Sequence, residues 1–193
     1  MGQETTDLNY ENNPEAYVIC RGERFRPFLT EAQIKERIQK LGEEISQEYE
    51  GKEPILIGLL NGAFMFIADL MREIRIDCEV DFFKLSSYGA EKVSSGKVQE
   101  LKSVDAKLKD RHVIVVDDIV DTGLTMQYIL NRIKEYEPAS VRVATFLHKP
   151  DSTQHELTLD YVGFEIPSKF VLGYGLDYDQ LGRNLSMLYV LDD

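Results

Sequence analysis

The stretch HVIVVDDIVDTGLTMQYILNRIKEY, residues 112–136, decides how this chain folds. It begins as an apolar run rich in the β-branched residues that favour strands, and it then changes to apolar residues at helical spacing. Three aspartates, Asp117, Asp118 and Asp121, lie between the two halves, together with a pair of threonines around Gly123. A strand that passes through a short turn into a helix is the building unit of α/β proteins. We therefore interpret this stretch as one such unit with an acidic turn.

The same order of elements appears elsewhere along the chain. PILIGLL, residues 54–60, predicts a buried strand, and the apolar spacing in residues 61–74 predicts a helix after it. Thr30 and Gln33 have the spacing of a capping box and predict the start of an amphipathic helix. Strands that alternate with helices favour an α/β fold with a mostly parallel, twisted sheet flanked by helices. Further strands are predicted at residues 78–88, 98–101, 141–147, 161–166, 170–175 and 187–191.

Composition narrows the classes of protein. The 193 residues suit one domain, and the net charge of -12 disfavours a surface that binds nucleic acid or anionic lipid. No signal pattern opens the chain, no apolar run approaches membrane-spanning length, and the two cysteines lack metal-ligand spacing. We expect a cytoplasmic protein with reduced thiols, without a nucleic-acid or membrane partner. The three histidines lack triad or metal spacing, and we interpret them as structural or surface residues.

The acidic turn predicts a ligand site. Ligands of open α/β sheets bind beyond the carboxyl ends of strands, where we expect Asp117 and Asp118. Adjacent carboxylates repel one another unless a cation or hydroxyl groups compensate, and ribose hydroxyls with Mg²⁺ would do so. Residues 121–125, DTGLT, open the predicted helix with free amides, a glycine and two hydroxyls, a combination suited to a phosphate.

Each part of the acidic turn also has a simpler interpretation. An Asp pair is usually a solvated turn, and a threonine at the start of a helix is usually only a cap. DTG also occurs in aspartic proteases, but that fold is all β, whereas this DTG lies between a strand and a helix. We favour the ligand site because all the parts follow one buried strand in succession. The polar loop GAEKVSSGK, residues 89–97, is long enough to be a mobile lid over such a site.

The stretch VIVVDDIVDTGLTM resembles the binding signature for phosphoribosyl pyrophosphate (PRPP) in type I phosphoribosyltransferases. The resemblance runs from about Thr30 to Leu185. It narrows to the hypoxanthine(-guanine) phosphoribosyltransferases of bacterial type through GLLNGAFMFIADL, VDFFKLSSYG, SSGKV and DYVGFEIPSKFVLGYGLDYDQLGRNL. It implies one phosphoribosyltransferase domain over residues 1–193, with a core at about 30–150. A small hood subdomain would be built from the N-terminal arm and residues 160–193.

The resemblance also implies the roles of residues in the acidic turn. Asp117 and Asp118 would engage the ribose hydroxyls, directly or through hydrated Mg²⁺. Asp121 would be the general base that takes the proton from purine N7. The amides and hydroxyls that would hold the 5'-phosphate belong to Thr122, Gly123, Leu124 and Thr125, and Asp121 would lie in the same PRPP site.

Residues further along the chain would bind the purine and the leaving group. Lys149 would donate to the 6-oxo group, Phe170 would stack on the ring or belong to the core, and the Val171 backbone would contact the far edge. Because adenine carries an amino donor at C6, the resemblance predicts that it is rejected. Asp177 would reach a second Mg²⁺ on pyrophosphate, and Arg183 would contact that group. Ser87 and Tyr88 would belong to the closing lid.

Three positions depart from the family pattern. The pyrophosphate loop, usually lysine-glycine and often with a cis peptide, reads Asn61 and Gly62. The residue before Arg183 is Gly182, where an aromatic is common, and Ser186 replaces a frequent proline.

Two functions are consistent with these residues. The first is a purine salvage enzyme that converts hypoxanthine or guanine and PRPP to IMP or GMP plus pyrophosphate, with Mg²⁺. The second is a PRPP-sensing regulator with the same fold, which should carry a basic face for nucleic acid. We favour the enzyme because the sequence lacks such a face and retains Asp121. The family implies a homodimer or homotetramer.

Overall fold

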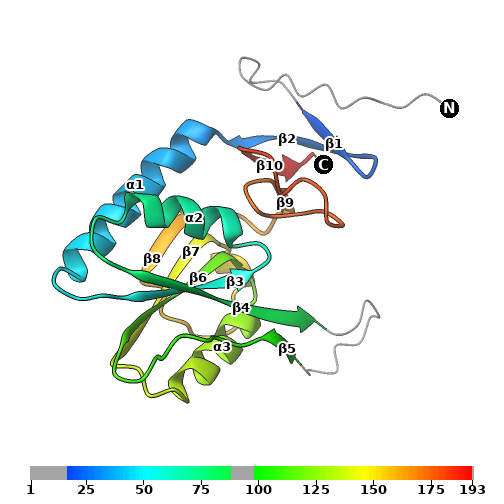
Figure 1. Cartoon of the computed structure of the whole chain (residues 1–193). Helices are drawn as coiled ribbons and strands as arrows, with labels where there is room; N and C mark the ends of the chain where they lie inside the picture. The colour runs from blue at the N-terminus through cyan, green and yellow to red at the C-terminus, as the bar shows by residue number, and fades with distance from the viewer. Residues whose placement is uncertain (1–16, 88–97, 193) are drawn as a thin grey trace. The chain divides into compact units, whose positions relative to one another are not determined.

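The computed structural model of the protein describes residues 17–87 and 98–192, and it falls into two compact units (Figure 1). The large unit is formed by residues 38–168, and the small unit by residues 1–37 together with 169–193. The expected N-terminal arm, the loop at residues 89–97 and Tyr88 lie outside the described residues.

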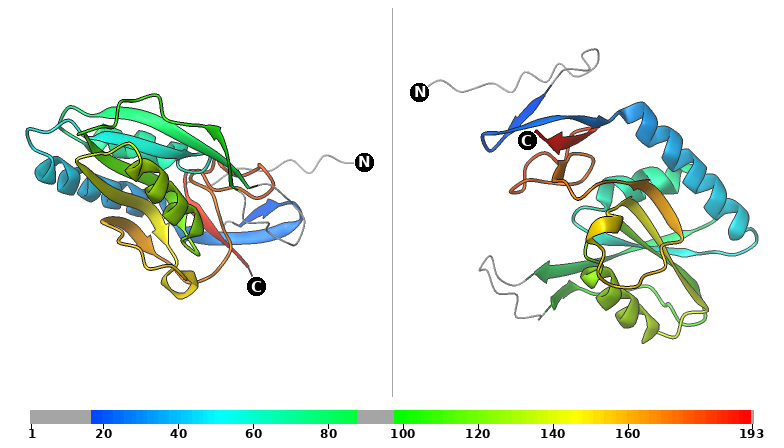
Figure 2. Two further views of the ribbon diagram at one scale, coloured as in Figure 1. Left: turned by 90° about the horizontal axis from the view of Figure 1, so that it is seen from below. Right: turned by 180° about the vertical axis from the view of Figure 1, so that it is seen from behind.

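The large unit is built around one twisted six-stranded sheet (Figure 2). Its strand order is β5-β4-β3-β6-β7-β8, and every pair is parallel except the antiparallel pair β4 and β5. This arrangement confirms the mostly parallel α/β sheet predicted from the sequence. The strands are β3 (Ile55–Leu60), β4 (Glu79–Ser87), β5 (Val98–Lys102), β6 (His112–Val120), β7 (Ser140–His148) and β8 (Tyr161–Glu165).

Helices cover both faces of this sheet, which explains why its central strands are apolar throughout. Side chains on one face of β6, such as Val115, pack in a cluster with Ile129 of α3 (Leu124–Lys134). On the other face, Phe146 of β7 lies 5.7 Å from the ring of Phe66 in α2 (Phe64–Glu73). Figure 1 shows α2 and α3 on opposite faces of the sheet.

The capping box predicted at Thr30 is present. The Thr30 backbone amide donates to Gln33 Oε1 at 2.9 Å, and the Gln33 amide donates to Thr30 Oγ1 at 3.3 Å. The predicted amphipathic helix, α1 (Glu31–Glu48), follows this capping box. The boundary between the two units falls within α1, after Arg37, and the chain passes between the units a second time at residues 168 and 169.

The small unit contains a four-stranded antiparallel sheet in the order β1-β2-β10-β9. Its strands are β1 (Val18–Cys20), β2 (Glu23–Leu29), β9 (Val171–Leu172) and β10 (Leu188–Leu191). The hairpin β1-β2, which the sequence analysis missed, turns at Arg21 and Gly22 with φ angles of 52° and 83°. Two positive φ angles are typical of the tight turn that joins antiparallel strands.

Two predicted strands have different bounds in the structure. The strand expected over residues 170–175 is limited to Val171–Leu172, because Gly173, Tyr174 and Gly175 have φ angles of 105°, 48° and 95° and curl the chain. In the large unit β6 extends to Val120, so the aspartate pair lies inside the final part of the strand and not beyond its end. The cause of this extension is continued pairing with β7, in which Ile119 and Val120 lie opposite Leu147 and His148.

Two expectations from composition can be compared with the described residues. None of their helices is both long and apolar enough to cross a membrane. Both cysteines are free, and burial raises the pKa of each thiol, which disfavours the reactive thiolate. The free thiols agree with the reduced thiols expected from the sequence.

Asp81 stabilises the edge of the large unit. Burial alone would raise the pKa of this carboxylate, but amides of Ala106, Phe82 and Asp105 and the ammonium of Lys102 donate to it, and the pKa is lowered. We expect Asp81→Asn to reduce the free energy of unfolding by about 2 kcal/mol at pH 7. Because the pKa is lowered by folding, this contribution exists above the unfolded pKa and disappears as pH falls through the folded pKa.

Urea unfolding of wild type and Asp81→Asn at pH 7 and pH 3 would check this prediction. The stability difference should shrink at pH 3. An equal difference at the two values of pH would mean that the charge on Asp81 is not what the amides and Lys102 recognise.

Candidate active site

The acidic turn lies at the carboxyl end of the large sheet, where two cavities meet. One cavity of about 270 Å³ is lined by Asn61, Gly62, Asp117, Asp118 and Thr125, among others. The second, of about 90 Å³, is lined by Asp117 and by residues 119–123, 125 and 126. Because both cavities share Asp117, Ile119 and Thr125, the aspartate pair and the DTGLT segment face adjoining spaces.

Asp117 is the buried member of the aspartate pair, with 7% of its surface exposed. Burial and then the neighbouring charge of Asp118 raise the pKa of Asp117 well above its usual range, against one hydrogen bond from the Asp118 amide at 3.0 Å. An ionised carboxylate in this position lowers the stability of the ligand-free protein. A bound cation or a set of hydroxyl donors would offset that cost.

We expect Asp117→Asn to raise the melting temperature of the ligand-free protein at pH 8. The pKa of Asp117 is raised by folding, so its contribution to stability is present below the unfolded pKa and is lost as pH rises through the folded pKa. Asparagine has no such loss. The gain should therefore be a few degrees at pH 8 and should nearly vanish at pH 4.

Thermal unfolding without Mg²⁺ or PRPP, at several values of pH, would check this prediction. Asp110→Asn is a suitable control because this acid lies in a turn at the opposite end of β6. A variant that is less stable than wild type at pH 8 would show that the carboxylate is stabilised already in the free protein.

Gly62 fits against Asp118 with no room for a side chain. A Cβ atom built on Gly62 would lie 1.7 Å from Asp118 Oδ2. The peptide bond between Leu60 and Asn61, immediately before it, is cis. The close approach brings the backbone at the carboxyl end of β3 against the aspartate pair on β6. The structure thus keeps the backbone feature implied by the resemblance, although Asn61 replaces the usual lysine.

The DTGLT segment leads into the first turn of α3. Gly123 is the N-cap residue, with a φ of 85° and no side-chain cap, and the Leu124 amide donates to Thr122 Oγ1 at 3.4 Å. A Cβ on Gly123 would lie 2.7 Å from Leu157 Cδ1, so Leu157 packs closely against the loop. Backbone amides at a helix N-terminus, beside the hydroxyls of Thr122 and Thr125, suit a phosphate monoester.

Lys149 reaches the acidic turn from the next strand. It follows β7, is only 9% exposed, and its Nζ donates to Asp121 Oδ2 at 2.8 Å. The two residues are 28 positions apart in the sequence. The structure therefore pairs the candidate base with the candidate purine-binding lysine. The resemblance implies that both lie near the purine, but it did not predict that they contact each other.

In the small unit, Phe170 is 44% exposed and its ring lies 5.3 Å from that of Tyr178. This exposure argues against a core role and leaves a ring surface for stacking. Asp177 pairs with Arg183 at 2.7 Å, and Arg183 also donates to the Gly175 carbonyl at 2.9 Å. Val171 is buried in β9.

The departure at Gly182 has a structural reason. Its φ is 90°, and a Cβ there would lie 2.4 Å from Leu172 Cδ1. An aromatic residue would be strained in this backbone conformation and would displace Leu172 from the small unit's core. Glycine is what this turn requires.

Of the predicted lid residues, Ser87 ends β4, whereas Tyr88 lies outside the described residues.

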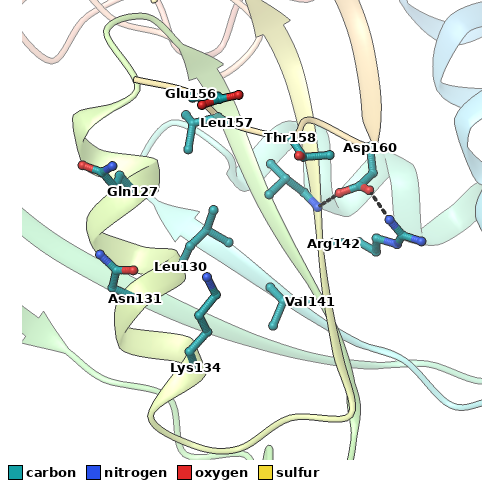
Figure 3. A pocket seen from close by; sticks show the side chains of 11 residues that line it. Gln127, Leu130, Asn131, Lys134, Val141, Arg142, Glu156, Leu157, Thr158 and Asp160 are labelled. Atoms are coloured by element: carbon teal, nitrogen blue, oxygen red, sulfur yellow. Dashed lines mark hydrogen bonds and ion pairs between the residues drawn. The ribbon is translucent and has the colours of Figure 1, made fainter. Parts of the chain in front are cut away.

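A larger cavity, of about 440 Å³, lies between α3 and residues 156–160 (Figure 3). Two acids, Glu156 and Asp160, line this cavity, and Asp160 is engaged by Arg142 Nη1 at 2.6 Å and by the Val143 amide at 2.8 Å. The aspartate pair and the DTGLT segment face the two smaller cavities, which therefore mark the candidate active site.

Comparison with known proteins agrees with this geometry. Residues 28–179 match the phosphoribosyl transferase domain family. The chain belongs to the phosphoribosyltransferase family. A hypoxanthine-guanine phosphoribosyltransferase from Aquifex aeolicus is 41% identical over 174 residues, which cover 90% of this chain and 98% of the relative. This likeness places the chain among the hypoxanthine-guanine phosphoribosyltransferases.

Solved structures of phosphoribosyltransferases share the fold. A hypoxanthine-guanine phosphoribosyltransferase from Bacillus anthracis superposes with a TM-score of 0.82 and 37% identity, covering 86% of this chain and 98% of that chain. The chain also matches the bifunctional protein TilS/HprT of Listeria monocytogenes, at 42% identity over 84% of its own length. This chain therefore spans about a quarter of that relative's length, since the match covers 25% of it.

Proposed function

We propose that this phosphoribosyltransferase is a purine salvage enzyme. It transfers the 5-phosphoribosyl group from PRPP to N9 of hypoxanthine or guanine, and the products are IMP or GMP and pyrophosphate. The observation that carries the proposal is the direct pairing of Lys149 with Asp121 beside the DTGLT segment. An ammonium donor and a carboxylate acceptor 2.8 Å apart complement a purine edge that presents the 6-oxo acceptor beside the N7–H donor.

The residues of the acidic turn fit Mg²⁺ in part. Among the described residues no group of three or more acidic, histidine or cysteine side chains gathers around one point. Mg²⁺ in phosphate sites is commonly held by one or two carboxylates, with the remaining ligands from water and substrate. Asp117 and Asp118 supply such a pair, and Asp177 would serve a second ion. Bound Mg²⁺ would neutralise charge on the pyrophosphate leaving group.

The protein residues would perform the remaining tasks of the transfer. Residues 122–125 hold the 5'-phosphate, and the backbone at Asn61 and Gly62 contacts pyrophosphate together with Arg183. Departure of pyrophosphate leaves positive charge on the ribose ring, so the reaction needs a positioned nucleophile and exclusion of water. Asp121 accepts the proton of purine N7, which makes N9 a better nucleophile as the new bond forms.

Selection of the purine follows from Lys149, Phe170 and Val171. Phe170 stacks on the ring, and the Val171 backbone contacts the edge opposite to Lys149. Adenine would place an amino donor against the Lys149 ammonium, leaving two donors without an acceptor. Ser87, at the end of β4, would belong to a lid over the substrates, whereas Tyr88 lies outside the described residues. The protein acts as one domain with a hood, in the cytoplasm, as a homodimer or homotetramer.

The test is the ultraviolet absorbance change after mixing the protein, PRPP and Mg²⁺ with hypoxanthine, guanine, xanthine or adenine separately. Turnover with hypoxanthine and guanine but not adenine is the expected result. Turnover chiefly with xanthine would keep the reaction and overturn the substrate. No turnover with any base, together with measurable PRPP binding, would overturn the enzyme and favour the PRPP-sensing alternative.

A further inference from the structure

The hydroxyl of Thr153 bridges the backbones of Asp121, the candidate base, and Lys149, the candidate purine-binding lysine. After Lys149 the chain makes the short turn η1 (Pro150–Ser152), which follows β7, and Thr153 comes next. The Thr153 hydroxyl oxygen is 2.9 Å from the carbonyl oxygen of Asp121 and 3.0 Å from that of Lys149. It is also 3.1 Å from Nε2 of His148. One hydroxyl thus contacts the backbone of both residues that face the proposed purine.

The chemistry of these three partners determines the direction of each hydrogen bond. Both carbonyl oxygens can only accept, so the single hydroxyl proton of Thr153 is shared between Asp121 and Lys149. The hydroxyl oxygen is then free to accept from His148, which assigns the ring proton to Nε2. The other ring nitrogen, Nδ1, faces Glu165 Oε1 at 3.7 Å. His148 therefore orients the hydroxyl that bridges the two carbonyls.

Two backbone hydrogen bonds flank this bridge. The Lys149 amide donates to the Val120 carbonyl at 3.0 Å, and the Gln154 amide donates to the Thr122 carbonyl at 3.1 Å. A threonine bonded only to the carbonyl four residues before it would be an ordinary turn. The bond to Asp121, 32 residues away, is not explained by a local turn. It joins the segment after β7 to the loop after β6.

We propose that Thr153 is a positioning residue that holds Asp121 and Lys149 at the separation needed by one purine edge. The inference rests on the proposed function, since it assigns the Asp121 carboxylate to N7–H and the Lys149 ammonium to the 6-oxo group. Thr153 itself touches neither. Its contribution is the fixed geometry of their backbones, because a displacement near 1 Å at a reacting group costs about a hundredfold in rate.

The experiment compares Thr153→Val with Thr153→Ser. Valine has the shape of threonine without the hydroxyl, whereas serine keeps the hydroxyl. We expect Thr153→Val to lower kcat with hypoxanthine by roughly tenfold to a hundredfold, with the KM for PRPP changed less than about threefold. Thr153→Ser should restore most of kcat. Equal kcat in wild type and Thr153→Val would overturn the proposal.

Ser140→Ala is the matched control. Ser140 Oγ lies 2.8 Å from Nδ1 of His112, at the opposite end of β7, so this variant also removes a bond between a hydroxyl and a histidine. Its melting temperature should fall while kcat stays at the wild-type value. If kcat fell equally in Ser140→Ala and Thr153→Val, general loosening of the sheet would explain both, and the proposal would fail.

A double-mutant cycle with Asp121→Asn separates positioning from stability. If Thr153 acts through Asp121, adding Thr153→Val to Asp121→Asn should cost clearly less in kcat than it costs in wild type. Fully additive losses would contradict the proposal.

Amide hydrogen exchange tests the Thr153 bridge independently of the proposed enzymatic function. Amides of Lys149 and of residues 151–154 should exchange faster in Thr153→Val and not in Ser140→Ala, whether or not the protein turns over any purine. If the wild type were inactive but showed this exchange pattern, the proposed enzymatic function would be overturned and the Thr153 bridge would stand. An unchanged exchange pattern would overturn the bridge itself.

Discussion

Asp121→Asn is expected to lower kcat with hypoxanthine by a factor of about 10² to 10⁴, while the Kd for PRPP changes by less than about threefold. Asparagine has nearly the same shape as aspartate and keeps an oxygen toward Lys149, so the geometry of the loop should persist. It cannot accept a proton from purine N7. The loss should therefore fall on the chemical step and not on the binding of PRPP.

Single-turnover kinetics and equilibrium dialysis of PRPP would separate these two quantities. Asp151→Asn is the matched control, because Asp151 is an exposed acid in the turn after Lys149 and the same charge is removed. Its kcat should equal that of wild type. An Asp121→Asn variant with unchanged kcat would remove Asp121 from the role of base. A large loss of PRPP affinity would instead assign it to the ribose site.

Gly62→Ala is expected to lower kcat/KM for PRPP by about a hundredfold or more, because the new methyl group would occupy the position of the Asp118 carboxylate. The distance of 1.7 Å from the Cβ position to Asp118 Oδ2 is far below any van der Waals contact, so either the aspartate or the loop must move. Overpacking of this kind also costs about 1–3 kcal/mol of stability.

The double variant Gly62→Ala with Asp118→Ala removes the clash, because it shortens the side chain at position 118. It should recover the melting temperature lost in Gly62→Ala but not the activity, since the carboxylate is then missing. Gly51→Ala is the control: its φ is also positive, at 71°, but no atom lies within 4 Å of the added Cβ. If Gly62→Ala and Gly51→Ala have equal kcat/KM, the close approach is not needed for PRPP.

Much of the large unit could be predicted because its signals are local. The apolar run ending at Val116 and the helical spacing after Leu124 predicted β6 and α3, since a strand or helix buries whatever its period places on one face. The capping box at Thr30 was predicted for the same reason, because its two hydrogen bonds join residues three positions apart. The concentration of aspartates after a buried strand, with a glycine that opens a helix, pointed to the candidate active site.

Other features had no local signal. The β1-β2 hairpin was missed because its turn, Arg21 and Gly22, carries no Asn-Gly or Asp-Gly signal. The end of β6 was placed too early because its last residues are held by pairing with β7, which a sequence window does not contain. The predicted strand at residues 170–175 was cut short by glycines whose backbone is set by close packing, as at Gly173, where a Cβ would lie 2.2 Å from the Met187 carbonyl oxygen.

The sequence by itself therefore determined the order of strands and helices, the acidic turn, and the kind of chemistry that such residues can perform. Only the tertiary structure decided which of these residues meet. Asp121 contacts Lys149 and Thr153, and Gly62 faces Asp118, because neighbouring parallel strands bring their carboxyl ends to one edge of the sheet. Residues far apart in the chain thus become neighbours through strand pairing. The periodicity of the sequence predicts the strands, but the site forms only when the strands pair.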